Sequence, residues 1–251
     1  MGSPESLAII GITFFVAGFV KGVIGLGLPT VSLALLTATV GLIPAMGLLI
    51  VPSFVTNVWQ AIQGGALVSI LKRLWPFLAA TFIGTLLGAK GLTGFDASLL
   101  AALLGSLLII YAGLNLHRPK VPDVSRIESW LGPLAGAVTG VLTGLTGSFV
   151  VPGVMYLQAL AMPRDTLIQA MGLSFTVSTV ALAIALNDQR LISQELGLLS
   201  AAGVVPAIIG MMIGQRVRGR LSEILFLRVF FAALAVLGVY ITARSLIAYA
   251  G

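Results

Sequence analysis

Eight long apolar blocks constrain this chain more than any other feature. A helix that spans a membrane needs about 20 consecutive apolar residues, and blocks of that length or longer lie at about 7–36, 41–63, 74–92, 97–116, 131–160, 166–186, 196–215 and 221–249. The chain is 58% hydrophobic and 9% charged, whereas soluble domains carry about 25% charged residues to cover their surface. The sequence therefore predicts an all-α polytopic membrane protein with about eight membrane segments, and the lipid bilayer is its expected surrounding.

The first and fifth blocks differ from the others because they are near 30 residues long and rich in glycine and proline. At a rise of about 1.5 Å per residue, each is too long for one straight crossing. We therefore expect a broken or re-entrant glycine-rich segment at both places.

A single long polar connection, at 117–129, divides the chain nearly in half. Short stretches on its two sides resemble each other in order: "GFVKGVIGLG" and "GAVTGVLTGLTG", "SFVTN" and "SFTVS", "GTLLGAK" and "GMMIGQR". Matches in the same order indicate an internal duplication. We predict a first membrane repeat at 1–116, a polar linker at 117–129 and a second repeat at 130–251, in two homologous halves that are either parallel or inverted.

The stretch "GFVKGVIGLGLP", residues 18–29, combines a lysine, four glycines and a proline inside an apolar block. An interrupted backbone in lipid persists only where it is buried in protein or lines a wet cavity. A half-helix beginning near Pro29 would present a positive pole that suits an anion. A buried lysine suits the same ligand, although Lys21 could instead extend to the membrane interface. The candidate binding residues here are Lys21, Gly22, Gly25, Gly27 and Thr30.

The corresponding stretch of the second half is "TGLTGSFVVP", residues 143–152, which places hydroxyl groups beside glycines. The hydroxyls could donate to the oxygens of an anion. In the alternative interpretation, the small residues only allow close helix packing, as the spacing Gly136-xxx-Gly140-xxx-Gly144 indicates. The candidate binding residues here are Thr143, Thr146, Gly147 and Ser148.

Polar side chains within two other blocks complete the predicted site. Asn57 and Gln60 lie three residues apart, and Ser174 and Ser178 lie four apart, so each pair shares one side of a helix. Such groups can bind a substrate, or they can join helices by hydrogen bonds. We include all four as candidates and leave both interpretations open.

Several kinds of chemistry have no support in the sequence. The chain has no cysteine and one histidine, His117, which lies in the polar connection. We therefore expect no catalytic site, no metal site and no cofactor. The net charge of +6 comes from basic residues in short loops, which positive-inside topology and lipid headgroups explain without nucleic acid. The expected partner is a small anionic substrate.

These motifs together resemble the sulfite exporter TauE/SafE family. The similarity rests on "GFVKGVIGLGLP", on "PSFVTN" followed by Gln60, and on "GVLTGLTGSFVVP" followed by "QAMGLSF", and it runs from about Leu7 to Ala248. The resemblance implies a permease of the cytoplasmic (inner) membrane that moves sulfite, organosulfonates such as sulfoacetate, or related oxyanions. The chain departs from the family pattern at 146–149, where it has Thr-Gly-Ser-Phe in place of a run of glycines.

The leading hypothesis is an exporter of small sulfur-containing oxyanions that works by alternating access around an anion site where the two broken segments meet. A first alternative is an uptake permease for a sulfur oxyanion or a small carboxylate. Two further alternatives are an intramembrane enzyme with Ser148 as nucleophile, which lacks a motif for a nearby base, and a structural subunit.

Overall fold

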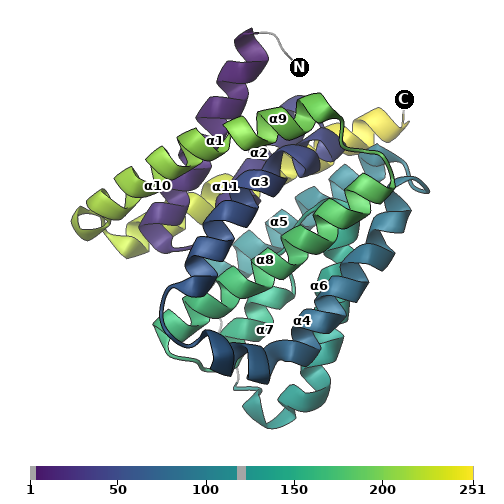
Figure 1. Ribbon diagram of the computed structural model, residues 1–251. Coiled ribbons are helices and arrows are strands. Elements are labelled where there is room, and N and C mark those ends of the chain that lie inside the picture. Colours follow the sequence, from purple (N-terminus) through teal and green to yellow (C-terminus); the bar gives the residue numbers. More distant parts are fainter. Residues whose placement is uncertain (1–3, 118–122, 251) are drawn as a thin grey trace. The chain divides into compact units, whose positions relative to one another are not determined.

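The computed structural model describes residues 4–117 and 123–250, and within them every regular element is a helix (Figure 1). The five residues 118–122 of the expected polar linker lie outside the described residues. In chain order the α-helices are α1 (Pro4–Ile24), α2 (Leu28–Val40), α3 (Leu42–Ile62), α4 (Leu67–Ala89), α5 (Ala97–His117), α6 (Glu128–Thr146), α7 (Gly153–Ala159), α8 (Arg164–Asp188), α9 (Gln194–Ala202), α10 (Val204–Val217) and α11 (Glu223–Ala250). Single 3-10 turns lie at Lys90–Leu92, Ser125–Ile127 and Arg218–Arg220.

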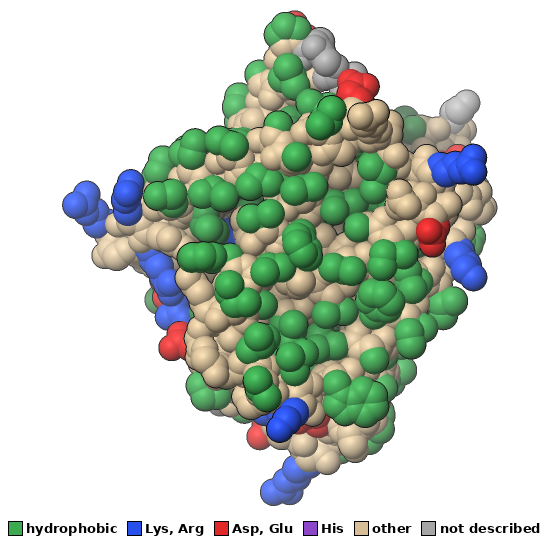
Figure 2. Space-filling model, viewed as in Figure 1, with side chains coloured by type: hydrophobic (Ala, Val, Ile, Leu, Met, Phe, Trp, Pro, Cys, Tyr) green, Lys and Arg blue, Asp and Glu red, His purple; other side chains and the backbone are tan. Residues whose placement is uncertain are grey.

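Seven stretches of the described chain are long and apolar enough to cross a membrane, which confirms the polytopic all-α class. Their bounds are Pro4–Ile24, Leu42–Ile62, Leu67–Leu92, Ala97–His117, Arg164–Asp188, Gln194–Arg220 and Glu223–Ala250. The apolar block at 131–160 is not among them; it is divided between α6 and the short α7. The count of eight segments therefore stays a prediction. Hydrophobic side chains are spread over the whole face in Figure 2, and the few charged groups lie mainly near its rim, as a surface in contact with lipid requires.

The helices form two compact units, and each unit contains chain from both predicted halves. Unit 1 comprises residues 1–52, 97–118 and 192–251, and unit 2 comprises 53–96 and 119–191. The chain passes from one to the other inside α3, directly after Pro52. The division into two sequence repeats is a separate statement and stays a prediction.

Unit 1 is built on two close helix pairs, α1 with α10 and α5 with α11, and α2 packs on both α1 and α11. Glycines make the first pair close: a Cβ added at Gly18 would overlap the carbonyl oxygen of Ala207, and one added at Gly22 would overlap that of Met211. Small residues at such spacing let two backbones approach each other in a membrane. The close approach of α1 and α10 therefore depends on residues that have no side chain.

A serine of α9 compensates for the proline inside α3. Because Pro52 has no N–H, the carbonyl oxygen of Leu48 loses its usual helical partner four residues later. The Ser200 hydroxyl donates to this oxygen at 2.7 Å and accepts from the N–H of Val51 at 3.1 Å. Ser200 is buried, so the bond joins α9 to α3 within unit 1 where the backbone ladder is interrupted.

Unit 2 is built on the pair α4 and α6, which lie side by side in Figure 1. Cβ atoms added at Gly136 and Gly140 would overlap the carbonyl oxygens of Phe77 and Thr81. This is the close packing that the spacing of the small residues in α6 indicates. Helix α8 packs on α4, and fewer contacts connect α7 with α6 and α8.

The two helix pairs have the same glycine contacts. Gly18 and Gly22 touch Ala207 and Met211, while Gly136 and Gly140 touch Phe77 and Thr81. Corresponding glycines of α1 and α6 differ by 118 in residue number. The residues that they touch, on α10 and α4, differ by 130. The offset of 126 between "GTLLGAK" and "GMMIGQR" differs from 130 by about one helical turn. An alignment of α4 with α10 by their glycine motifs is therefore one turn away from the alignment that their contacts indicate.

Candidate functional site

The first helix break lies in unit 1, where α1 ends at Ile24 and α2 begins at Leu28. Gly25 and Gly27 have φ values of 80° and 105°, in the left-handed region that glycine adopts without steric cost. The N–H of Gly25 donates to the carbonyl of Lys21 at 2.8 Å and closes α1, and the N–H of Val31 donates to the carbonyl of Gly27 at 2.8 Å in the first turn of α2. The glycines thus define the geometry of the break.

Lys21 stands in the last turn of α1, directly before this break. Its side chain is 5% exposed, and it is the one charged side chain that is buried among residues 4–117 and 123–250. A cation is favoured near the C-terminal end of a helix by the helix dipole. The burial places a positive charge inside unit 1 and not on its surface.

The start of α2 adds further positive potential in the same unit. No side chain caps this helix start, and Pro29 has no N–H, so the N–H groups of Leu28 and Thr30 are the ones that lack intrahelical partners. Thr30 is buried there. Gly22 has a different environment, because its open face is filled by α10. Among the five candidates of this unit, Gly22 therefore has a role in helix packing.

The second break lies in unit 2, where α6 ends at Thr146 and α7 begins at Gly153. Gly147 has a φ of 73°, and its N–H donates to the carbonyl of Thr143 at 2.7 Å. The Thr143 hydroxyl donates to the carbonyl of Ser148 at 2.9 Å. The Thr146 hydroxyl donates to the carbonyl of Leu142 at 2.6 Å and accepts from the N–H of Ser148 at 3.2 Å. Both threonine hydroxyls thus donate to the chain's own carbonyls and hold the break in shape.

Unlike those of Thr143 and Thr146, the Ser148 hydroxyl makes no hydrogen bond and could donate one to a ligand. Ser148 is 3% exposed, and its Oγ has no hydrogen-bond partner. The ring of the next residue, Phe149, lies 5.9 Å from that of Phe175 on α8. That contact brings the break beside the part of α8 that carries Ser174 and Ser178, both of which are buried.

Two further buried hydroxyl oxygens of unit 2 have no partner, those of Ser178 and Ser53. A buried polar atom without a partner is uncommon and calls for an explanation such as a ligand or water. Ser53 was not among the candidates from the sequence. Its spacing in the sequence could have identified it, because Ser53 lies four residues before Asn57 and so shares one face of α3 with it.

Three side-chain amides of unit 2 are buried, those of Asn57, Gln60 and Gln169, and two of them join helices. Asn57 is fully buried. Gln60 donates to the carbonyl of Ile168 at 2.6 Å. Gln169, which the sequence analysis did not select, donates to the carbonyl of Ala61 at 2.7 Å and accepts from the N–H of Ala66 at 3.0 Å. The contacts of Gln60 therefore match the interpretation in which an amide joins two helices by a hydrogen bond.

The thirteen candidates therefore gather in two places. Lys21, Gly22, Gly25, Gly27 and Thr30 belong to unit 1, and Asn57, Gln60, Thr143, Thr146, Gly147, Ser148, Ser174 and Ser178 belong to unit 2. One place holds a buried cation close in sequence to a helix start whose first N–H groups lack intrahelical partners, and the other holds neutral donors. In residues 4–117 and 123–250, no three His, Cys, Asp or Glu side chains lie together in a way that could hold a metal ion.

Comparison with protein families gives a match to the family described as sulfite exporter TauE/SafE over residues 10–241. Comparisons with curated proteins and with solved structures gave no match. The family match covers nearly the whole chain and agrees with the resemblance inferred from its motifs. The chain belongs to the sulfite exporter TauE/SafE family of membrane transporters.

Proposed function

We propose that this transporter exports a small sulfur-containing oxyanion, such as sulfite or an organosulfonate of the sulfoacetate type, across the cytoplasmic (inner) membrane. The observation that carries the proposal is the burial of Lys21 beside a helix break. A buried ammonium group in a membrane is costly, and an anionic ligand offsets that cost when it is bound. The first-turn amides of α2 favour the same sign of ligand.

The hydroxyls of unit 2 support a ligand rich in oxygen acceptors. Ser148 and Ser178 are buried hydroxyls without partners, and a hydroxyl can donate one hydrogen bond to an oxyanion. Such neutral donors replace part of the hydration shell of the ion without holding it by charge. We propose that they contact the substrate during transport, while Thr143 and Thr146 keep the break in shape.

The direction of transport follows from the charge of the substrate. With the cell interior negative, an anion of charge −2 gains about 4.6 kcal/mol per 100 mV on leaving the cell. Accumulating the same ion inside requires a coupled process, for which a buried carboxylate is the usual proton carrier. Lys21 is the one buried charged side chain of the described residues, so export driven by the potential needs fewer components than uptake.

Alternating access through two homologous halves is the mechanism that we propose. In many transporters, internal repeats rock or gate around a central site. The matching glycine contacts of α1 with α10 and of α6 with α4 support an internal duplication, because in both pairs two glycines four residues apart touch two residues four apart. Uptake of a sulfur oxyanion or a small carboxylate is the second candidate function.

The test is flux of sulfite, sulfoacetate and acetate in liposomes that contain the full chain. We expect sulfite or sulfoacetate flux that responds to an imposed potential, and we expect Lys21→Met to remove most of it because the neutral side chain no longer attracts the anion. Lys72→Met is the matched control, since Lys72 is exposed. Undiminished flux in Lys21→Met would refute the role of the ammonium group. Acetate flux alone would favour the carboxylate alternative, and inward transport that depends on a proton gradient would favour uptake.

A further inference from the structure

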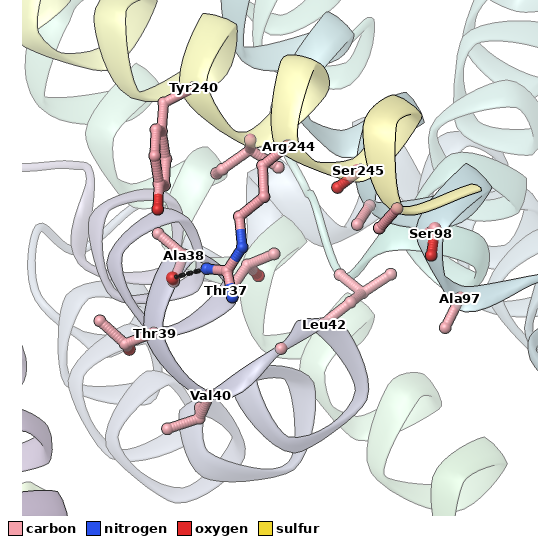
Figure 3. A pocket seen from close by; sticks show the side chains of 14 residues that line it. Thr37, Ala38, Thr39, Val40, Leu42, Ala97, Ser98, Tyr240, Arg244 and Ser245 are labelled. Atoms are coloured by element: carbon pink, nitrogen blue, oxygen red, sulfur yellow. Dashed lines mark hydrogen bonds between the residues drawn. The ribbon is translucent and has the colours of Figure 1, made fainter. Parts of the chain in front are cut away.

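A polar cavity of about 340 Å³ lies within unit 1, away from the breaks described above. It is lined by the last residues of α2, the first residues of α3 and α5, and the last turns of α11. Figure 3 shows Arg244 extending from α11 toward the end of α2, where its guanidinium lies beside Ala38 and Thr37. The cavity thus contains one charged side chain, which comes from α11.

The groups that line this cavity favour an anion. One guanidinium nitrogen of Arg244 donates to the carbonyl of Ala38 at 2.6 Å, which leaves other N–H donors of the five that arginine has. Thr37 is 7% exposed, and its hydroxyl oxygen has no partner. The starts of α3 and α5 and the ends of α2 and α11 all line the cavity, so the partial charges of the helix ends offset one another and the Arg244 guanidinium determines the sign. No acidic side chain is among the lining residues in the part of the chain that the structure describes.

An apolar groove of about 670 Å³ adjoins the polar cavity and shares Tyr240 with it. The groove follows α1, α2 and α11 within the same unit, and its lining residues include no charged side chain. On α11, Leu237 lines the groove, Tyr240 lines both spaces and Arg244 lines the cavity. This spacing of three and then four residues keeps all three on one helix face.

The same order holds on α2. Val31 and Leu35 line the groove, and Thr37 and Ala38 line the cavity. A polar, positively charged cavity therefore continues directly into a long apolar surface along two neighbouring helices. A tyrosine at the junction is typical of the boundary between the hydrocarbon region and the headgroups. This combination matches a molecule with a phosphate at one end and hydrocarbon at the other.

We infer that the cavity and groove together bind an anionic phospholipid, with its phosphate at Arg244 and Thr37 and an acyl chain along α2 and α11. One guanidinium balances the single negative charge of a phosphodiester. A zwitterionic headgroup would also bring an ammonium group, and the described lining offers no carboxylate to receive it. Basic pockets between membrane helices recognise anionic lipid headgroups by the same means.

The experiment measures binding to the full chain in detergent by native mass spectrometry and by the shift in thermal unfolding temperature. The probes are phosphatidylglycerol, phosphatidylethanolamine and inorganic phosphate. We expect phosphatidylglycerol to be retained and to raise the unfolding temperature, since a ligand that binds only the folded state stabilises it. Arg244→Gln should weaken its retention by about fivefold to tenfold, the effect of about 1 kcal/mol or slightly more for one cation. Arg228→Gln is the matched control, because Arg228 lies on the same helix and lines neither space.

Two further variants keep the test independent of the folding of Arg244→Gln. Thr37→Val removes the hydroxyl at nearly constant volume, and Ala233→Phe fills the groove without changing charge. Each should reduce retention of phosphatidylglycerol. Equal retention of phosphatidylethanolamine would overturn the choice of an anionic lipid, and equal stabilisation by inorganic phosphate would show a site for the free ion. If Arg244→Gln lowers stability but retains the lipid, the arginine only caps α2, and the inference is wrong.

Discussion

Replacing Ser200 by alanine tests how unit 1 tolerates a proline inside α3. The change removes the donor to the carbonyl of Leu48, which Pro52 cannot supply. A buried acceptor left without a partner costs about 1–3 kcal/mol, and hydrogen bonds between membrane helices average about 0.6 kcal/mol. We therefore expect Ser200→Ala to lower the free energy of unfolding by about 1–2 kcal/mol.

A matched control separates this effect from the loss of any buried hydroxyl. Ser32 is also buried, and its hydroxyl donates to the carbonyl of Leu28 at 2.7 Å within α2. That carbonyl keeps its backbone partner four residues later, so Ser32→Ala should cost well under 1 kcal/mol. Unfolding by sodium dodecyl sulfate in mixed micelles measures both variants.

The decisive measurement is a double-mutant cycle with Pro52→Ala. Alanine restores the N–H that can donate to the carbonyl of Leu48, so Ser200→Ala should cost less in that background. A coupling energy of about 0.5 kcal/mol or more is expected for two groups that act on one acceptor. If Ser200→Ala costs the same with either residue at position 52, the serine does not compensate for the proline.

Two further predictions concern glycine packing and the second break. Gly140→Ala should destabilise the chain, because the added Cβ would overlap the carbonyl oxygen of Thr81. Gly113→Ala should stabilise it by up to about 1 kcal/mol, because nothing lies within 4 Å of the added atom. Thermal unfolding in detergent compares the two variants, and equal shifts in unfolding temperature would contradict the packing argument. Thr143→Val should lower the free energy of unfolding by about 1 kcal/mol and reduce anion flux, since it removes the donor to the carbonyl of Ser148. Unchanged flux and unfolding free energy would show that the break does not need this bond.

Local features of the fold could be predicted from the sequence because they depend on residue type. The all-helical class and the multi-pass character follow from the length of the apolar blocks. The two interruptions fall inside the glycine-rich stretches, since left-handed φ values at Gly25 and Gly147 need glycine. The burial of Lys21 agrees with its place in the middle of an apolar block.

Features that depend on distant partners could not be predicted. Nothing in α3 shows that Ser200, almost 150 residues later, will donate to the carbonyl that Pro52 leaves open. Hydroxyls also have two possible uses, and only the geometry shows that Thr143 binds its own chain while Ser148 does not. The contacts of α10 and α4 correspond at an offset one turn away from the offset that aligns their glycine motifs, and only the geometry shows this.

The pairing of α1 with α10 has a consequence for synthesis at the ribosome. About 180 residues separate the end of α1 from the start of α10, so the glycine face of α1 cannot meet its partner until α10 has been translated. The segments of unit 2, in contrast, are all complete by residue 191. Unit 2 can therefore assemble while residues 192–251 are still being made, whereas unit 1 needs α9, α10 and α11.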